Sequence, residues 1–250
     1  MKKGIIVASF GTSYEEARKK CIETIEDKIK EKYYDYHITR AFTSRMIIKK
    51  LKKRDNLYIF NEKEAMEDMK KKGIEEVYIQ PLHIIPGHEY EKLTFLGLKV
   101  GKPLLYSDRD YEKIVSHLEI GELNKKEALV FMGHGSDHDA DMAYKKLEKS
   151  YRNKGIDNVF IATVEGKRTI EDVVVDLKKA NILKVVLRPF MLVAGDHAIN
   201  DMASDEEDSW KSILKKEGFE VEIILRGLGE YKIIQDIYLS HLEQLLEGKQ

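Results

Sequence analysis

Short apolar runs rich in β-branched residues alternate with longer, charged segments along the whole chain. The apolar runs have the length and composition of β-strands and cover residues 4–10, 37–43, 76–82, 103–106, 128–132, 158–163, 184–190 and 220–225. The charged segments carry apolar residues at helical spacing and cover residues 14–32, 62–72, 89–96, 111–119, 137–152, 169–179, 201–216 and 231–246. Strands that are apolar on both faces and are joined by helices indicate parallel sheets with helices on both sides.

The order of short motifs indicates that the chain contains the same unit twice. The segment "VASFGTS" (7–13) matches "VFMGHGS" (130–136), and "TRAFTSR" (39–45) matches "ATVEGKR" (162–168) at the same offset. A third pair, "PLHIIPGHEY" (81–90) and "PFMLVAGDHA" (189–198), follows at a shorter offset. We therefore expect an α/β fold of two similar halves, residues 1–122 and 123–250, each with a four-stranded parallel sheet flanked by helices. Ligands of such sheets bind beyond the carboxyl ends of the strands, so the two halves predict an active-site cleft between them.

Two histidines and a glutamate follow the ends of successive strands in the second half. They are His134 in "GHG", Glu165 in "VEG" and His197 in "GDH". Taken alone, His134 could be an ordinary hydrogen-bonding loop residue, and Glu165 or His197 could cap a helix. Taken together, two imidazoles and a carboxylate predict a three-point site for a divalent ion such as Co²⁺, Ni²⁺, Fe²⁺ or Zn²⁺. The open positions of such a site would hold water or substrate.

The first half carries different groups at the equivalent positions. Gly11-Thr12-Ser13 opens a helix, so its hydroxyls and N–H groups suit a carboxylate or phosphate, or simply cap the helix. Arg45 follows the second strand, and His88 and Glu89 follow the third. The glycine patterns of nucleotide-binding loops are absent from the sequence, and we expect no nucleotide site.

The composition excludes several other classes of protein. A net charge of −1 with interleaved signs argues against nucleic-acid binding, and the single cysteine, Cys21, excludes an intrachain disulfide and a cysteine-based metal cluster. No apolar run reaches the length of a membrane span, and the first strand is too short for a signal sequence. A cytoplasmic protein without membrane contact is therefore expected, and homo-oligomers are left open.

These motifs resemble the anaerobic cobalt chelatases of cobalamin biosynthesis, which belong with ferrochelatase to the ATP-independent chelatases. The resemblance runs from "VASFGTSYEEAR" through "PLHIIPGHEYEKL", "VFMGHGS" and "VEG" to "RPFMLVAGDHAINDM", and so covers essentially the whole chain. It implies two similar α/β halves with a tetrapyrrole in the cleft between them. It also implies insertion of Co²⁺, itself a substrate, into sirohydrochlorin without a nucleotide.

The resemblance assigns roles to the predicted site residues. His134, Glu165 and His197 are implied as metal ligands, with His134 and His197 also taking part in catalysis and His134 accepting pyrrole protons. Glu89 is implied as an acidic residue across the cleft that serves proton removal or metal delivery. The carboxylates of the substrate would meet helix N-termini and cations. The residues expected to contact the substrate are Gly11, Thr12, Ser13, Arg45, His88 and Ser136.

Two alternatives stay open from the sequence. The chain could be a ferrochelatase or nickel chelatase acting on sirohydrochlorin or a related tetrapyrrole, because a nitrogen and oxygen site does not by itself select Co²⁺ over Fe²⁺ or Ni²⁺. It could also be a non-catalytic carrier of a metal or a tetrapyrrole.

Overall fold

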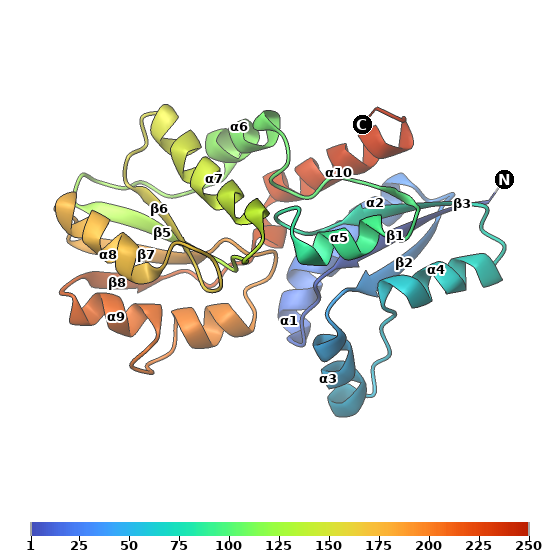
Figure 1. Ribbon diagram of the computed structural model, residues 1–250, viewed down its shortest axis with the longest axis horizontal. Helices are drawn as coiled ribbons and strands as arrows, with labels where there is room; N and C mark the ends of the chain where they lie inside the picture. The colour runs from blue at the N-terminus through green and yellow to red at the C-terminus, as the bar shows by residue number, and fades with distance from the viewer. Residues whose placement is uncertain (1, 250) are drawn as a thin grey trace. The chain divides into compact units, whose positions relative to one another are not determined.

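The computed structural model describes residues 2–249 and divides into two compact units. The first unit takes the chain up to Tyr106 and again from Gly229 onward, and the second is Ser107–Leu228. Each unit holds one four-stranded parallel sheet between helices, as Figure 1 shows. The expected fold class is therefore confirmed.

The first sheet has the strand order β2-β1-β3-β4, with all strands parallel. In the central register, Val7 lies opposite Arg40 on one side and opposite Gln80 on the other. The strands are β1 (Lys3–Ser9), β2 (His37–Phe42), β3 (Glu76–Pro81) and β4 (Lys99–Val100). The helices of this unit are α1 (Glu15–Ala17), the π-helix η1 (Arg18–Glu23), α2 (Thr24–Lys32), α3 (Arg45–Asp55), α4 (Glu62–Lys71), α5 (His88–Thr94) and α10 (Lys232–Leu246).

The second sheet repeats this topology with the order β6-β5-β7-β8, again all parallel. Its strands are β5 (Glu127–Gly133), β6 (Val159–Thr163), β7 (Lys184–Pro189) and β8 (Glu220–Ile223). Its helices are α6 (Asp108–His117), the 3₁₀-helix η2 (Asp139–Asp141), α7 (Met142–Asn153), α8 (Ile170–Lys179), the π-helix η3 (Ala198–Met202) and α9 (Trp210–Lys216), and the 3₁₀-helix η4 (Leu228–Glu230) follows. The repeated strand order explains the repeated motifs.

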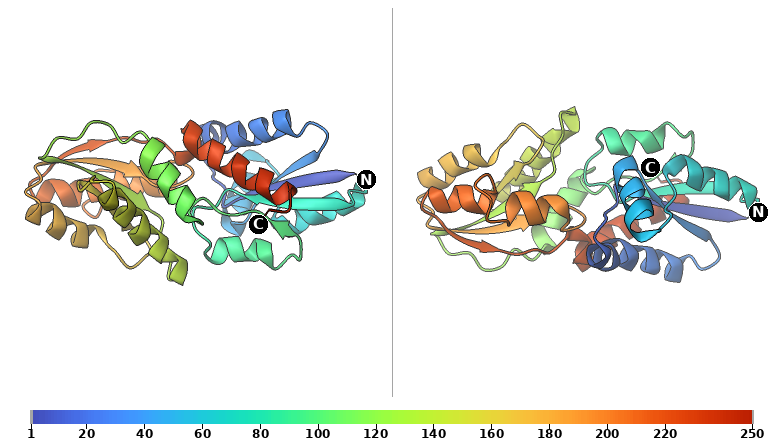
Figure 2. Two further views of the ribbon diagram at one scale, coloured as in Figure 1. Left: turned by 90° about the horizontal axis from the view of Figure 1, so that it is seen from above. Right: turned by 90° about the horizontal axis from the view of Figure 1, so that it is seen from below.

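Both faces of each sheet are covered, because the side chains of a strand alternate between its faces. In the second unit, Val130 packs with α8 and α9, whereas its neighbour Phe131 contacts Tyr151 of α7. In the first unit, Ile6 and Ala8 pack with α4 and α5, and α2 and α10 lie on the other side of the sheet (Figure 2). Apolar residues on both faces are the reason why these strands are continuous apolar runs in the sequence.

The last helix returns to the first unit, which places the boundaries differently from the expected division at residue 122. Helix α10 packs against β3, and the buried hydroxyl of Tyr238 donates to the carbonyl oxygens of Leu82 (3.0 Å) and His83 (3.2 Å). Helix α6, in turn, belongs to the second unit, where it packs against α7. Each sheet is thus completed by a helix that lies outside its own half of the sequence.

Three local predictions differ from the structure. The fourth strand is β4 rather than 103–106, because the amides of Leu104 and Leu105 donate to the loop after β3 and not to a strand. The predicted helix 201–216 is broken between η3 and α9. Helix α3 was not predicted as an element; it buries only Leu51, so its sequence lacks a clear apolar face.

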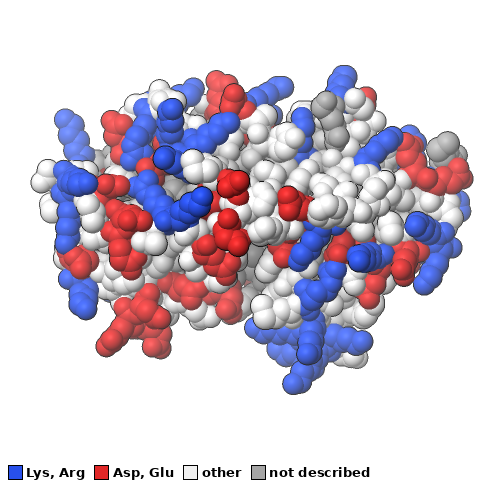
Figure 3. All heavy atoms as spheres, viewed as in Figure 1, with Lys and Arg blue, Asp and Glu red and all other residues white. Residues whose placement is uncertain are grey.

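Charged side chains gather in two places on the face shown in Figure 3. Basic residues lie over α3, whose sequence is RMIIKKLKKRD, and acidic residues lie over the loop between η3 and α9. Among the described residues, every helix is too short or too polar to cross a lipid bilayer.

We expect Tyr238→Phe to lower the free energy of unfolding by about 1 kcal/mol, because the carbonyl oxygens of Leu82 and His83 lose the hydrogen bond from the buried hydroxyl while the ring stays in place. Urea unfolding of the intact chain measures this. Tyr34→Phe is the matched control, since the side chain of Tyr34 is 87% exposed and its loss should change the midpoint little. Equal effects of the two substitutions would contradict the role of α10 in closing the first unit.

Candidate metal centre

The order of the strands in the second sheet brings the three predicted metal ligands together. His134 follows β5, the central strand, while Glu165 follows β6 and His197 follows β7, the two strands that flank it. Since parallel strands end at the same edge of a sheet, three residues far apart in the sequence meet there. The grouping predicted from the sequence is what the structure contains.

The three side chains can offer ligand atoms that all lie within 4.8 Å of one another. The rings of His134 and His197 have centroids 4.8 Å apart and are perpendicular, and Nδ1 of His134 lies 3.7 Å from Oε2 of Glu165. Three atoms that surround one ion evenly at about 2.1 Å are about 3.6 Å apart or less, so a closure of about 1 Å would bring these atoms to coordination distance. The side chains are 34 to 58% exposed, which leaves the site accessible.

Hydrogen bonds indicate which ring nitrogen of each histidine is available to bind a metal ion. Nδ1 of His134 lies 3.0 Å from the carbonyl oxygen of Gly135. A carbonyl only accepts, so Nδ1 carries the proton in the neutral ring and Nε2 carries the lone pair. In the same way, Nδ1 of His197 lies 2.5 Å from Oδ2 of Asp201, which assigns the Nε2 lone pair of His197 to a metal. A carboxylate behind a ligating histidine fixes its ring and increases its basicity.

The loops that carry His134 and Glu165 are packed tightly against each other. Beyond the strands, the amide of Glu165 donates to the carbonyl of His134 over 2.8 Å. Gly135 has φ +78°, and a Cβ on it would lie 2.4 Å from the amide nitrogen of Gly166. The glycines that the sequence placed beside the ligands are thus required by contact between the two loops.

Two buried side chains of the next turn support these loops. Asp141 accepts hydrogen bonds from the amides of Ser136 (3.2 Å) and Lys167 (3.1 Å) and so joins the two loops. Tyr144 hydrogen-bonds to the backbone of Gly135 and His134, and its burial raises the pKa of its hydroxyl above the usual value. Sequence reasoning missed Asp141, Tyr144 and Asp201. Only Asp201 gave a signal, since it lies one helical turn after His197.

His138 does not belong to this group of ligands. Its Nδ1 accepts a hydrogen bond from the amide of Ala140 over 3.0 Å and caps the 3₁₀-helix η2. Ser136 gives its amide to Asp141, and its hydroxyl accepts from the amide of His138 over 3.1 Å. Contact of Ser136 with a substrate stays a prediction and would use the hydroxyl.

In the first unit, the Gly-Thr-Ser loop is buried and serves its own fold. Gly11 has φ +95°, and a Cβ on it would lie 2.4 Å from the ring of Phe42. The hydroxyl of Thr12 accepts from the amide of Tyr14 over 3.2 Å, and the carbonyl of Ser13 accepts from Arg54. The N-cap residue of α1 is Tyr14 and no side chain caps the helix, so the bond of Thr12 belongs to a local turn and not to a helix cap. Anion binding by this loop stays a prediction.

The cation expected to bind substrate carboxylates already has a carboxylate partner. Arg45 makes two hydrogen bonds to the buried Glu62, and a third to the carbonyl of Thr43 over 3.2 Å. Burial opposes the ionisation of Glu62, but the bonds from Arg45 outweigh it and hold the pKa of Glu62 below its usual range. A substrate carboxylate at Arg45 would therefore compete with Glu62.

Glu89 and His88 open helix α5. Oε1 of Glu89 accepts from Lys92 Nζ over 2.5 Å, while its Oε2 is buried and has no hydrogen-bond partner in the fold. His88 is more exposed and lies 3.8 Å from Glu91. Both residues belong to the first unit, and the metal centre belongs to the second. The expectation that Glu89 and His88 face the metal centre across a cleft therefore stays a prediction.

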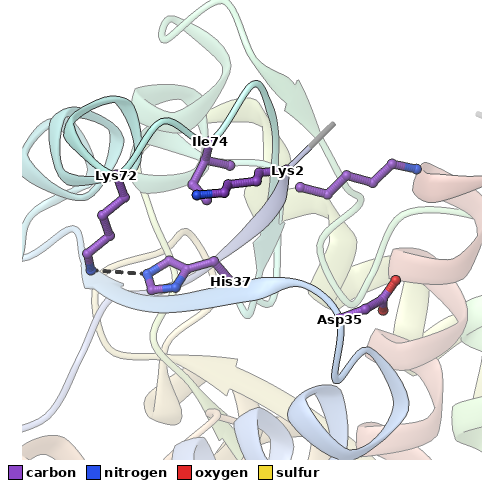
Figure 4. Close-up of a pocket in the computed structure, with 6 residues that line it drawn as sticks. Lys2, Asp35, His37, Lys72 and Ile74 are labelled. Carbon is purple, nitrogen blue, oxygen red and sulfur yellow. Dashed lines mark hydrogen bonds between the residues drawn. The ribbon is translucent and has the colours of Figure 1, made fainter.

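A pocket of about 360 Å³ lies away from these loops, at the amino ends of the first sheet's strands (Figure 4). Burial and the neighbouring Lys72 hold the pKa of His37 below its usual value, so the neutral ring accepts a hydrogen bond from Lys72 over 3.1 Å. The lining residues are Lys2, Lys3, Asp35, His37, Lys72 and Ile74. None of the predicted site residues belongs to it.

Solved structures identify the fold as that of the chelatases. SirB from Bacillus subtilis, in a structure with Fe³⁺, covers 100% of this chain and 98% of its own with a TM-score of 0.64 and 13% identity. DR2241 from Deinococcus radiodurans, a multi-domain protein with structural similarity to chelatases, gives a TM-score of 0.57 at 11% identity, over 96% of this chain and 54% of its own. At these identities the likeness concerns the fold alone.

The sequence places the chain in a particular family. The cobalt chelatase (CbiK) family model matches residues 3–247, and the chain belongs to this family. The sirohydrochlorin cobaltochelatase of Salmonella typhimurium is 39% identical over 98% of this chain and 97% of its own. The sirohydrochlorin cobaltochelatase CbiKC of Nitratidesulfovibrio vulgaris is 33% identical over 96% and 89%. The resemblance drawn from the motifs is confirmed.

We expect Asp201→Asn to weaken Co²⁺ binding by roughly 10-fold to 100-fold, because His197 loses the charge that orients its ring and increases its basicity. Titration of the metal-free protein with Co²⁺, followed by the visible absorbance of the ion, measures this. Asp205→Asn removes a carboxylate nearby in the sequence, which pairs with Lys211, and should bind Co²⁺ as the wild type does. Equal affinities of the two variants would refute the role of Asp201.

Gly135→Ala should lower Co²⁺ affinity at least about 10-fold and also destabilise the second unit, since its Cβ would meet the Gly166 backbone. The control is Gly121→Ala, because Gly121 has a similar φ of +80° but nothing within 4 Å of an added Cβ. Gly121→Ala introduces the strain of a positive φ without a steric clash. It should lower the free energy of unfolding by about 1 kcal/mol and leave Co²⁺ binding unchanged. If both variants bind Co²⁺ normally, loop contact does not position the ligands.

Proposed function

We propose that this chain catalyses the insertion of Co²⁺ into sirohydrochlorin, with release of two pyrrole protons and without a nucleotide. The observation that carries the proposal is the triad of His134, Glu165 and His197 at three adjacent strand ends, in a chain of the cobalt chelatase family. The relatives named sirohydrochlorin cobaltochelatase, similar over nearly their whole length, support the choice of both substrates.

The triad suits an ion that must be passed on. Three protein ligands leave coordination positions for water or for the ring nitrogens, so the ligands can be exchanged one at a time. The atoms lie slightly too far apart for ideal coordination, and the side chains are partly exposed. An enclosed site with four thiolates would hold the ion more tightly, and the chain has a single cysteine.

Metallation requires bases, because each of two pyrrole N–H groups must lose its proton as the ion enters. Imidazole is a suitable acceptor near neutral pH, and we assign one proton to His134. His134 then acts both as a metal ligand and as a base, at successive stages. We assign the other proton to the carboxylate of Glu89, whose side chain is partly exposed and accepts a hydrogen bond from Lys92.

The remaining contacts with the substrate are part of the same proposal. Thr12, Ser13, Ser136 and His88 would meet the rim of the macrocycle, and Arg45 would do so by exchanging Glu62 for a substrate carboxylate. No nucleotide is needed if binding energy distorts the macrocycle toward the transition state. A cytoplasmic location, the lack of nucleic-acid binding and the oligomeric state stay predictions.

The decisive test mixes purified protein with metal-free sirohydrochlorin and Co²⁺ under anaerobic conditions and follows the absorbance change on metallation. Parallel reactions with Fe²⁺ and Ni²⁺ test the ferrochelatase and nickel chelatase alternatives. We expect catalysis above the uncatalysed background with Co²⁺. Tight binding of metal or tetrapyrrole without any acceleration would indicate a carrier and overturn the proposal.

His134→Ala and His197→Ala should each lower kcat/KM roughly 100-fold or more while the unfolding midpoint stays within about 1 °C of wild type, because each removes a ligand at the partly exposed end of a strand. His117→Ala is the control: this exposed histidine, at the end of α6, contacts only the carbonyl of Lys113 one turn earlier among the bonds described. Wild-type rates in the first two variants would remove the triad from the mechanism.

A further inference from the structure

Helix α3 of the first unit carries lysines that the mechanism above does not use. Its sequence, RMIIKKLKKRD, has one carboxylate, Asp55, which pairs with Arg54 over 2.7 Å. Arg45, at its start, is bonded to Glu62. The other cations of the helix are all exposed and are called the α3 lysines: Lys49, Lys50, Lys52 and Lys53. Basic side chains cover this helix in Figure 3, although the whole chain has a net charge of −1.

The α3 lysines differ from the lysines of other helices because they have no carboxylate partner. Lys19 pairs with Glu15 over 2.8 Å, and Lys232 pairs with Asp236 over 2.5 Å, in each case one helical turn away. Within residues 2–249, none of the α3 lysines forms an ion pair with a carboxylate. Their positive charge is therefore not neutralised by the fold.

The spacing of these cations opposes the helix. Arg45, Lys49 and Lys53 follow one another at intervals of one turn, and so do Lys50 and Arg54. Like charges at this spacing are neighbours on the helix surface and destabilise it. The helix dipole favours cations in the last turn, but Lys49 and Lys50 precede that turn. The fold thus keeps a repulsive arrangement that it does not need, which indicates a role outside the helix.

Helix α3 lies at the ligand-binding edge of its own sheet. It begins at Arg45, shortly after the carboxyl end of β2, and projects from the rest of the first unit (Figure 1). Near its other end, Arg54 donates to the carbonyl of Ser13 over 2.5 Å, and Lys50 lies 5.9 Å from the ring centroid of Tyr14. The helix therefore runs beside the loop that follows β1. Ligands of parallel sheets bind at this edge.

The proposed substrate is an anion that such a surface attracts. Sirohydrochlorin carries carboxylates around its ring, and these are ionised near neutral pH because the pKa of a carboxyl group is about 4. Exposed charges act over a Debye length, about 10 Å at 0.1 M salt, and so act on a ligand before any contact forms. Fields of this kind increase association rates about 10-fold to 1000-fold, and added salt removes the effect.

We propose that the α3 lysines form an electrostatic guide, which attracts the polycarboxylate tetrapyrrole to the strand-end edge of the first sheet and increases its rate of association. They act during the encounter, whereas other groups hold the bound substrate. Their loss therefore slows association and leaves dissociation and kcat unchanged. This inference rests on the proposed function, which supplies the identity of the substrate.

A variant without the four charges tests the proposal. Its substitutions are Lys49→Gln, Lys50→Gln, Lys52→Gln and Lys53→Gln. Stopped-flow absorbance measures the association of metal-free sirohydrochlorin with the metal-free protein, under anaerobic conditions and over a range of salt concentrations. We expect the association rate constant to fall about 10-fold at low salt, with the dissociation rate constant unchanged. At high salt the variant and the wild type should converge, because screening removes the field from both.

The matched control removes the same charge from the opposite edges of the two sheets. It combines Lys70→Gln and Lys71→Gln at the end of α4 with Lys215→Gln and Lys216→Gln at the end of α9, all at exposed positions. An effect of net charge alone would appear equally in both variants. Equal association rates in the control and in the α3 variant would therefore overturn the proposal.

A second variant changes the charge without the lysines that cover aromatic rings. Lys50 and Lys52 lie over Tyr14 and Tyr58, whereas Lys49 and Lys53 do not lie over a ring among the described residues. Lys49→Glu with Lys53→Glu changes the charge as much as the four glutamines do, and it should reproduce their slower association. Glutamate and glutamine are both good helix formers, so the urea midpoint should stay at that of the wild type.

Three other outcomes would contradict the guide. They are an association rate of the wild type that does not respond to salt, a variant that changes only the dissociation rate, and a salt-dependent self-association of the wild type that the α3 variant loses while its association with sirohydrochlorin stays unchanged. The last, measured by sedimentation velocity, would assign the lysines to a second copy of the chain. Because these measurements need no turnover, a wild type that binds sirohydrochlorin without catalysis would overturn the proposed function and leave the test of the α3 lysines intact.

Discussion

The metal centre depends on one constraint of parallel sheets: every strand ends at the same edge. The strand order β6-β5-β7 places His134 between Glu165 and His197, although the chain forms a helix and further loops between them. A sheet of antiparallel strands would send alternate strand ends to opposite edges and could not assemble this triad from successive strand ends. The chemistry therefore follows from the topology, and the topology follows from the strands that are apolar on both faces.

The loops at this edge combine a rigid frame with an open site. Asp141 and Tyr144 form hydrogen bonds to the backbone of these loops, and the contact of Gly135 with Gly166 leaves no room for a Cβ at Gly135. The side chains above this frame are only partly buried and slightly too far apart for ideal coordination. That combination suits a protein that must select an ion and then release it to a stronger ligand, because a preorganised but incomplete coordination shell binds without trapping.

The two sheets have equivalent strand orders but carry different side chains at their strand ends. The second unit places nitrogen ligands after β5 and β7, whereas the corresponding loops of the first unit carry the buried Gly-Thr-Ser turn after β1 and Glu89 after β3. In the first unit, Nε2 of His83 lies 3.4 Å from the hydroxyl of Thr43, and both residues are buried.

The two parallel sheets and the grouping of the triad could be predicted from the sequence, because apolar runs and strand-end positions are local features that the topology preserves. It did not reveal α3, which buries only Leu51, or β4, an edge strand of two residues. The folded structure was needed to show which sheet α10 covers, that Asp141 joins two loops, and which ring nitrogen of each histidine is free to bind a metal. These features depend on contacts between residues far apart in the chain, or on the geometry of single hydrogen bonds, and neither leaves a periodic pattern in the sequence.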